Sequence, residues 1–81
     1  MTLRWQDLST VELDAVSDYE EMMREAESLW AEGEYDAGNA ASDAAADYLS
    51  GEVRSQYTDP NGLLASQRFF MVWHLAVAPD A

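Results

Sequence analysis

The chain has 81 residues, which suits one small domain spanning residues 1–81. Hydrophobic residues make up 48% of it, including three Trp, four Tyr and two Phe, so the composition is not that of a disordered chain. The formal net charge is −12, from 16 acidic residues against four Arg and no Lys, which argues against direct binding to nucleic acid or to an anionic membrane.

The absence of cysteine excludes a disulfide framework and thiolate chemistry. The N-terminus has no basic region followed by an apolar run, so we expect no signal peptide. The longest apolar run, residues 69–73, is too short to cross a membrane. We therefore expect a soluble, intracellular protein.

The first element follows a short lead, residues 1–7, in which Leu3 and Trp5 are expected to dock on the core. Ser9 and Glu12 fit the capping-box pattern, in which an N-cap serine and a glutamate three residues later bond each other's backbone N–H groups. The pattern predicts a helix over residues 10–32, ended by Gly33.

Two faces separate when residues 10–32 are projected at about 100° per residue. The apolar face carries Val16, Tyr19, Met23, Ala26 and Trp30. A second face carries a row of acids without any basic residue: Asp14, Asp18, Glu21, Glu25 and Glu32. On a flank between them, Glu20, Arg24 and Glu27 are expected to pair.

The negative charge of this helix approaches that of a phosphate strand. Residues 12–32 carry eight carboxylates and one Arg, and they span about 30 Å at about 1.5 Å per residue. This gives about one net charge per 4 Å, against about one per 3.4 Å for a single DNA strand. Such a row is either a solvated face or an imitation of something negative.

The second element is an alanine-rich helix over residues 36–50, with Asp36 as its cap and Gly51 as its stop. Small side chains let two helices approach closely, so a helical hairpin with the first helix is expected. Asp36, Asp43 and Asp47 form a second acidic row on it. The turn and the bulky–small alternation, with Gly33, Tyr35 and Ala45, resemble one tetratricopeptide-like hairpin, although Gly38 and Ser42 depart from that family's alanine and bulky residue.

The last third begins with residues 52–58, predicted as a helical turn or a loop, and continues into a strong turn signal at residues 58–62. That signal can also start a helix, with Asp59 as its cap and Pro60 at its first position. Apolar residues cover most of the helical surface of residues 63–77, which predicts a buried central helix ended by Pro79. Residues 69–77 could instead form a buried strand, but no second strand is available to pair with it.

Together these elements predict an all-α fold: a small helical bundle in which a long acidic N-terminal helix and an Ala-rich second helix form a hairpin packed on an apolar C-terminal helix. Residues 1–59 hold 15 of the 16 acids, so the charge is strongly segregated. We expect the arginines to pair locally. Most aromatic residues are assigned to the core, namely Trp30, Tyr35, Phe69, Phe70 and Trp73, whereas Trp5 and Tyr57 are candidates for exposed contacts.

No catalytic constellation is evident. The only histidine, His74, is read as a partly buried structural residue, because no nucleophile or second base accompanies it in the sequence. There is no phosphate-binding loop, Ser/His/Asp set or calcium-binding loop pattern. We therefore expect no enzymatic activity, no cofactor and no specific metal site.

In length, acidity and absence of Lys and Cys, the chain resembles small phage-encoded inhibitors that imitate DNA, the anti-CRISPR and anti-restriction proteins. The resemblance implies a protein of the bacterial host cytoplasm, a monomer or weak homodimer, whose carboxylates replace phosphates in the basic groove of a CRISPR effector complex. The residues expected to bind are Asp14, Asp18, Glu21, Glu25, Glu32, Asp36, Asp43 and Asp47. The alternatives are an acidic regulatory or antitoxin-like domain that binds a partner through its apolar C-terminal segment, and a generic acidic domain.

Overall fold

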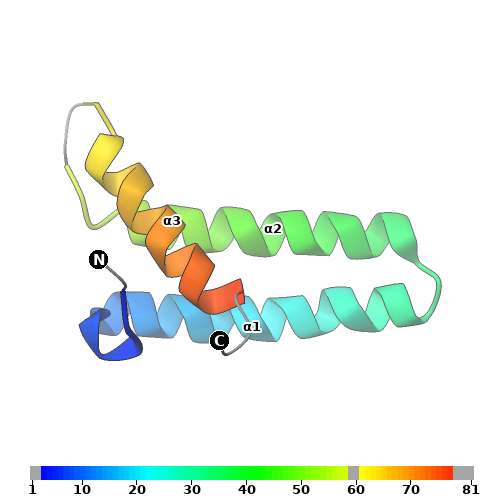
Figure 1. Cartoon of the computed structure of the whole chain (residues 1–81). Coiled ribbons are helices and arrows are strands. Elements are labelled where there is room, and N and C mark those ends of the chain that lie inside the picture. The colour runs from blue at the N-terminus through cyan, green and yellow to red at the C-terminus, as the bar shows by residue number, and fades with distance from the viewer. Residues whose placement is uncertain (1–2, 59–60, 78–81) are drawn as a thin grey trace.

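The structure is a computed structural model that describes residues 3–58 and 61–77. These residues contain three α-helices and one short 3-10 helix (Figure 1). They are η1 (Trp5–Asp7), α1 (Thr10–Ala31), α2 (Tyr35–Arg54) and α3 (Leu63–Val77). Helices α1 and α2 form an antiparallel hairpin, and α3 lies obliquely across one face of it near the open end. No strand occurs in these residues, so the predicted all-α bundle is confirmed, including a helix at residues 69–77.

Local signals set both ends of α1. The Ser9 hydroxyl accepts from the Glu12 N–H at 3.1 Å, and the Glu12 carboxylate accepts from the Ser9 N–H at 2.9 Å, which completes the predicted capping box. At the other end Gly33 has a φ of +84°, a conformation that favours glycine. The N–H groups of Gly33 and Glu34 donate to the carbonyls of Trp30 and Leu29, so the helix ends in a Schellman motif.

Both predicted boundaries of α2 are wrong. The helix begins at Tyr35, and its N-cap residue Glu34 makes no capping bond through its side chain, so Asp36 lies in the first turn and is not the cap. The helix also continues past Gly51 to Arg54. A glycine inside a helix costs about 1 kcal/mol relative to alanine, and the burial of Val53, which is 0% exposed, outweighs that preference.

Small residues line the seam between α1 and α2, as predicted for a close hairpin. Ala26 and Ala45 are fully buried, and Leu49 and Val53 complete the α2 side. Gly38 is packed against the Trp30 indole so tightly that a Cβ at this position would overlap the ring. The departure of Gly38 from the tetratricopeptide pattern is therefore a packing requirement of this hairpin.

Helix α3 is not the buried central helix that its composition predicts. Only Ala65 and Val72 are buried, whereas Phe70 is 63% exposed. A third helix laid across a two-helix hairpin contacts it through one stripe only, so no other described helix covers Phe70 on the opposite side of α3. The assignment of Phe70 and of Tyr35, which is 66% exposed, to the core is therefore wrong.

The remaining aromatic residues fall mostly where predicted. Trp73 packs edge-on against the buried Tyr19 ring, with the ring centroids 5.4 Å apart, and Phe69 lies beside Trp73. Trp5 is 43% exposed, which agrees with its assignment as a candidate exposed contact and contradicts the expectation that it docks on the core. Tyr57 is partly buried and packs against the core, which contradicts its assignment as an exposed contact. Leu3 also packs against the core, as predicted.

Three predicted features fall outside the described residues: Asp59 as a cap, Pro60 as the first helical residue, and Pro79 as the end of the last helix. Within the described part, Gly62 has a φ of +66° and immediately precedes α3. The turn predicted before this helix is thus present at Gly62.

Candidate acidic partner-binding surface

The eight carboxylates predicted to bind a partner are all exposed. They belong to two sets. The α1 row consists of Asp14, Asp18, Glu21, Glu25 and Glu32, and the α2 row consists of Asp36, Asp43 and Asp47.

The α1 row lies on the face of the hairpin that faces away from α3. Helix α3 contacts α1 at Glu12 through Arg68 and at Tyr19 through Trp73, and Met23 lines the groove between the two helices. At about 100° per residue, the centre of the α1 row is roughly 160° around the helix from those three positions. The row therefore has open solvent in front of it along most of the helix.

The α2 row points in a different direction. Its three aspartates are roughly 160° around α2 from the buried Gly38, Ala45 and Leu49, which face α1. They therefore lie on the outer edge of the hairpin, next to the face that carries the α1 row. The structure places the two rows on adjacent sides and does not merge them into one flat surface.

Two α2 residues that the sequence analysis did not assign to the site do join the α1 row. The Tyr48 hydroxyl donates to Asp18 Oδ2 at 2.7 Å. This hydrogen bond, some desolvation of the phenol and the negative charges of Asp18, Glu52 and Asp14 raise the pKa of Tyr48 to about 12. Asp18 thus contacts the phenol directly, and Asp14 and Glu52 act on it through their negative charge.

A specific signal could have revealed this cluster. Tyr48 and Glu52 are four residues apart, and such residues share one face of a helix. The prediction ended the second helix at residue 50 and made residues 52–58 a helical turn or a loop, so it did not place Glu52 on the same helix face as Tyr48. The correct end of α2 at Arg54 brings Glu52 onto the hairpin.

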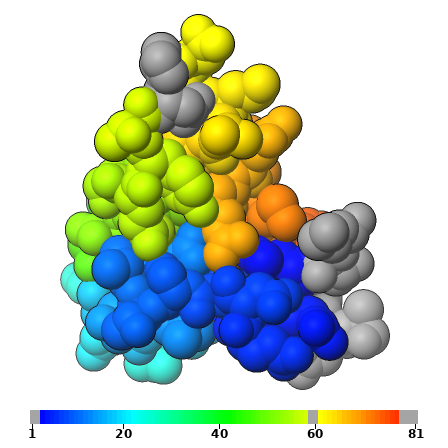
Figure 2. Space-filling model, turned by 90° about the vertical axis from the view of Figure 1, so that its left-hand side faces the viewer, coloured from blue at the N-terminus to red at the C-terminus, as the bar shows by residue number. Residues whose placement is uncertain are grey.

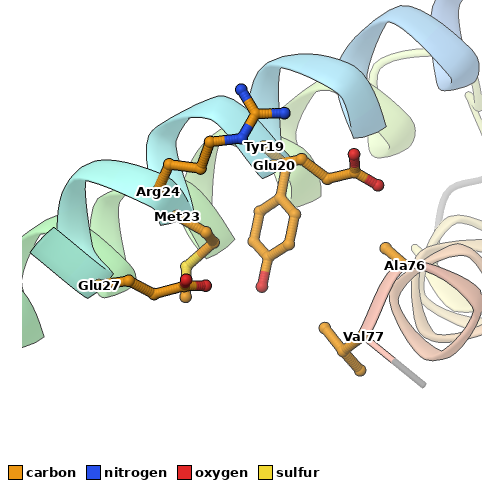
Figure 3. A pocket seen from close by; sticks show the side chains of 7 residues that line it. All are labelled: Tyr19, Glu20, Met23, Arg24, Glu27, Ala76 and Val77. Atoms are coloured by element: carbon orange, nitrogen blue, oxygen red, sulfur yellow. The ribbon is translucent and has the colours of Figure 1, made fainter. Parts of the chain in front are cut away.

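Arginines do not neutralise either row within the described residues. Arg4 lies 3.8 Å from Asp7 at the surface, and Arg54 donates to the hydroxyls of Ser50 and Ser66. Arg24 makes no ion pair with Glu20 or Glu27 in this part of the chain, so the predicted neutralised flank is not formed (Figure 3). Among residues 3–58 and 61–77, no cation pairs with a carboxylate of either row.

The shortest ion pair among the described residues joins Arg68 to a buried acid, Glu12, which belongs to neither row. Glu12 is 1% exposed and accepts from Arg68 Nε and Nη2, each at 2.7 Å, while Nη2 also donates to the Asp7 carbonyl at 3.0 Å. The Arg68 hydrogen bonds hold the pKa of Glu12 below its ordinary value, against the opposing effect of burial. Arg68 and Glu12 are 56 residues apart, so the prediction that the arginines pair locally is wrong for Arg68.

This pair lies where the open end of the hairpin meets α3. Figure 2 shows that end of the molecule, with η1 and the start of α1 in blue beneath the end of α2 and the first turns of α3. Glu12 therefore has a structural role in two respects, as the capping-box residue of α1 and as the anchor of α3. It does not contribute to the exposed charge.

An open groove of about 440 Å³ lies between α1 and the C-terminal end of α3 (Figure 3). Its walls combine apolar side chains with charged ones from the flank of α1. It is lined by Tyr19, Glu20, Met23, Arg24, Glu27, Ala76 and Val77. It does not contain His74, which is exposed on α3 and is not partly buried as predicted.

Among residues 3–58 and 61–77, no group of three or more His, Cys, Asp or Glu side chains is arranged to hold a metal ion. No helix in the same ranges combines the length and apolar character needed to span a bilayer.

The chain matches no protein-family model, no curated protein and no solved structure.

Proposed function

We propose that this chain is a non-enzymatic inhibitor that imitates the negative surface of DNA and blocks DNA binding by a CRISPR-Cas effector complex. The observation that carries the proposal is the α1 row, five exposed carboxylates along one helix face with no arginine paired to them. Like charges at these spacings repel by a few tenths of a kcal/mol per pair, so the row costs the free protein stability. A basic groove on a partner would remove that cost on binding.

Glu12 is buried, so it does not count toward the exposed charge of α1. The density of the remaining exposed charge still supports the imitation of a polyanion. From Asp14 to Glu32 the helix exposes seven carboxylates and Arg24, a net charge of −6 over about 27 Å. This is about one charge per 4.5 Å, against about 3.4 Å for a DNA strand. Glu52 adds a further carboxylate beside the row.

The test replaces Asp14 and Asp18 by Asn and Glu21 and Glu25 by Gln. We expect this variant to lose inhibition of DNA binding by the effector complex, because the face opposite α3 loses most of its charge. The control replaces the α2 row, Asp36, Asp43 and Asp47, by Asn, and we expect a smaller loss because that row points to an adjacent side. Equal inhibition by the wild type and the α1-row variant would contradict the proposal.

A second candidate function is favoured by the exposed apolar face of α3. In this case the chain is an acidic regulatory or antitoxin-like domain whose partner binds α3, while the acids supply solubility. The α1-row variant would then keep its binding, and Phe70→Glu would remove it. The same two variants therefore separate the two functions.

A further inference from the structure

The groove between α1 and the C-terminal end of α3 contains a polar group that the fold itself does not use. Tyr19 is only 5% exposed, and its ring packs against Trp73. Figure 3 shows its hydroxyl directed into the groove, towards the end of α3. No hydrogen bond within residues 3–58 and 61–77 uses this hydroxyl, and burial alone raises the pKa of Tyr19 above its ordinary value. The groove therefore offers a buried phenol, through its hydroxyl, to a ligand.

Two carboxylates stand on the rim of the groove. Glu20 and Glu27 are exposed and lie seven residues apart on α1, which is about 10 Å along the helix, with Met23 between them. Arg24 is the one cation among the described lining residues. It pairs with neither carboxylate in the described ranges, although a glutamate four residues before an arginine is a favourable spacing. Both carboxylates are thus able to bind an incoming cation.

The opposite wall of the groove is apolar. Ala76 and Val77 come from the last turn of α3, and Val77 is 44% exposed. Together with Met23 they form a surface over which a flexible aliphatic chain can lie. The volume of about 440 Å³ falls in the lower part of the range of about 300–1,000 Å³ for small-ligand sites. The groove therefore suits an occupant with an apolar stem and a polar head.

Charge decides the sign of that head. Two carboxylates against one guanidinium give the rim a net charge of −1, and the whole chain carries −12, so an anion is repelled from the groove. A guanidinium fits better than an ammonium, because its five N–H donors in one plane can bond a phenol oxygen and a carboxylate together. An ammonium is also the more strongly hydrated ion. An arginine side chain meets all these requirements.

We propose that this groove is a docking site for an arginine side chain presented by a protein partner. The aliphatic stem of that arginine lies over Met23 and Val77. Its guanidinium donates to the Tyr19 hydroxyl oxygen and to the carboxylate of Glu20 or Glu27. The site is separate from the α1 row, which lies on the opposite side of α1 from Tyr19 and Met23, so it goes beyond the proposed function.

The experiment is an NMR titration of the whole protein, with ¹³C-labelled methionine methyl groups, using an acetylated and amidated Gly-Arg-Gly tripeptide as the probe. Met23 reports on the groove, and Met71, which is 36% exposed and lies outside the groove lining, is the internal control. We expect a saturable shift of the Met23 signal with a millimolar Kd, because one side chain makes few contacts, and weaker binding at high salt. We expect no saturable shift of Met71.

Two further probes separate the chemistry of the arginine head. A tripeptide with citrulline in place of arginine keeps the shape and removes the charge. A tripeptide with lysine keeps the charge and removes the planar set of donors. We expect each to bind at least about fivefold more weakly than the arginine probe.

The first variant is Tyr19→Phe, which removes the hydroxyl and keeps the ring beside Trp73. We expect it to bind the arginine probe about two- to tenfold more weakly, which is the loss of one hydrogen bond. The matched control is Tyr48→Phe, which removes a phenol hydroxyl bonded to Asp18 outside the groove, and we expect it to bind as the wild type does.

Variants of the exposed rim keep the test valid if Tyr19→Phe fails to fold. We expect the double variant Glu20→Gln with Glu27→Gln to weaken binding of the arginine probe by about two- to fivefold, and Arg24→Gln to strengthen it by a similar factor. The α1-row variant should bind the probe as the wild type does, because its four changed residues lie outside the groove lining.

Four results overturn the proposal. The first is a Met23 signal that does not move with the arginine probe at about 20 mM. The second is equal binding of the lysine or citrulline probe. The third is binding that is unchanged both by Tyr19→Phe and by the double glutamate variant. The fourth is loss of binding in the α1-row variant, which shows that the peptide collects on the acidic surface and not in the groove.

Discussion

Replacing Arg68 by Met tests how α3 is held on the hairpin. The substitution removes both hydrogen bonds to Glu12 and the one to the Asp7 carbonyl, while the methionine keeps most of the apolar stem. Glu12, which is 1% exposed in the wild type, then keeps the backbone N–H of Ser9 as a hydrogen-bond donor but loses its cation. Removing one partner of a buried ion pair costs about 3–5 kcal/mol.

That magnitude is large for this protein. A domain of this size has a total stability of about 4–12 kcal/mol at the usual 0.05–0.15 kcal/mol per residue. We therefore expect Arg68→Met to remove about a quarter or more of the free energy of unfolding. The assay is urea denaturation followed by circular dichroism at neutral pH, with the dependence on urea concentration compared between variants.

Two further variants isolate the cause. The double variant Glu12→Gln with Arg68→Met removes both charges and leaves an amide oxygen that can still accept from Ser9, so we expect it to recover about half of the loss. Arg4→Met removes an ion pair of 3.8 Å whose side chains are 68% and 42% exposed, and we expect a change below about 0.5 kcal/mol.

The pH dependence has a definite sign. The pKa of Glu12 is lowered in the folded protein, so the pair stabilises fully above the ordinary carboxyl pKa of 4.5, and this contribution is lost as pH falls through the lowered value. The stability difference between wild type and Arg68→Met should therefore shrink in acid. A difference below about 1 kcal/mol at neutral pH, or one that does not change with pH, would refute the reasoning.

Three other perturbations have clear expected outcomes. Gly38→Ala should destabilise the hairpin by about 1–3 kcal/mol in urea denaturation, because the added methyl overlaps the Trp30 indole; Gly51→Ala, with open space around it, should be neutral or stabilising. Asp18→Asn should lower the pKa of Tyr48 from its value of about 12, measured by tyrosinate absorbance against pH, because the hydrogen bond to a carboxylate is its largest cause. Raising salt from about 0.1 to 1 M should raise the melting temperature by screening the unpaired carboxylates, and the α1-row variant should melt higher than wild type at low salt and gain less from salt.

Elements specified by nearby residues could be predicted from the sequence. The start of α1 depends on Ser9 and Glu12, three residues apart, and its end depends on Gly33, so both follow from local backbone chemistry. The antiparallel hairpin follows from the short turn and the small residues of α2. The exposure of all eight predicted acids also follows, because unpaired charges are rarely buried.

Features set by packing between distant segments were not predictable in the same way. Helix α2 continues past Gly51 because Val53 is buried against the core, and the helix propensities of the local residues do not indicate this extension. Arg68 finds Glu12 across 56 residues, and this pairing removes Glu12 from the exposed acids. The direction of the α2 row relative to the α1 row depends on how the hairpin packs. The apolar composition of α3 did not distinguish a buried helix from one with an exposed apolar face.

Competition for DNA binding tests the central proposal most directly. A type I CRISPR surveillance complex is incubated with this protein across a range of salt concentrations, and its binding to target DNA is measured. We predict that DNA binding is lost at low salt, that inhibition weakens steeply as salt rises, and that the α1-row variant does not inhibit. Undiminished DNA binding at low salt, with the protein in excess, would contradict the account for that complex.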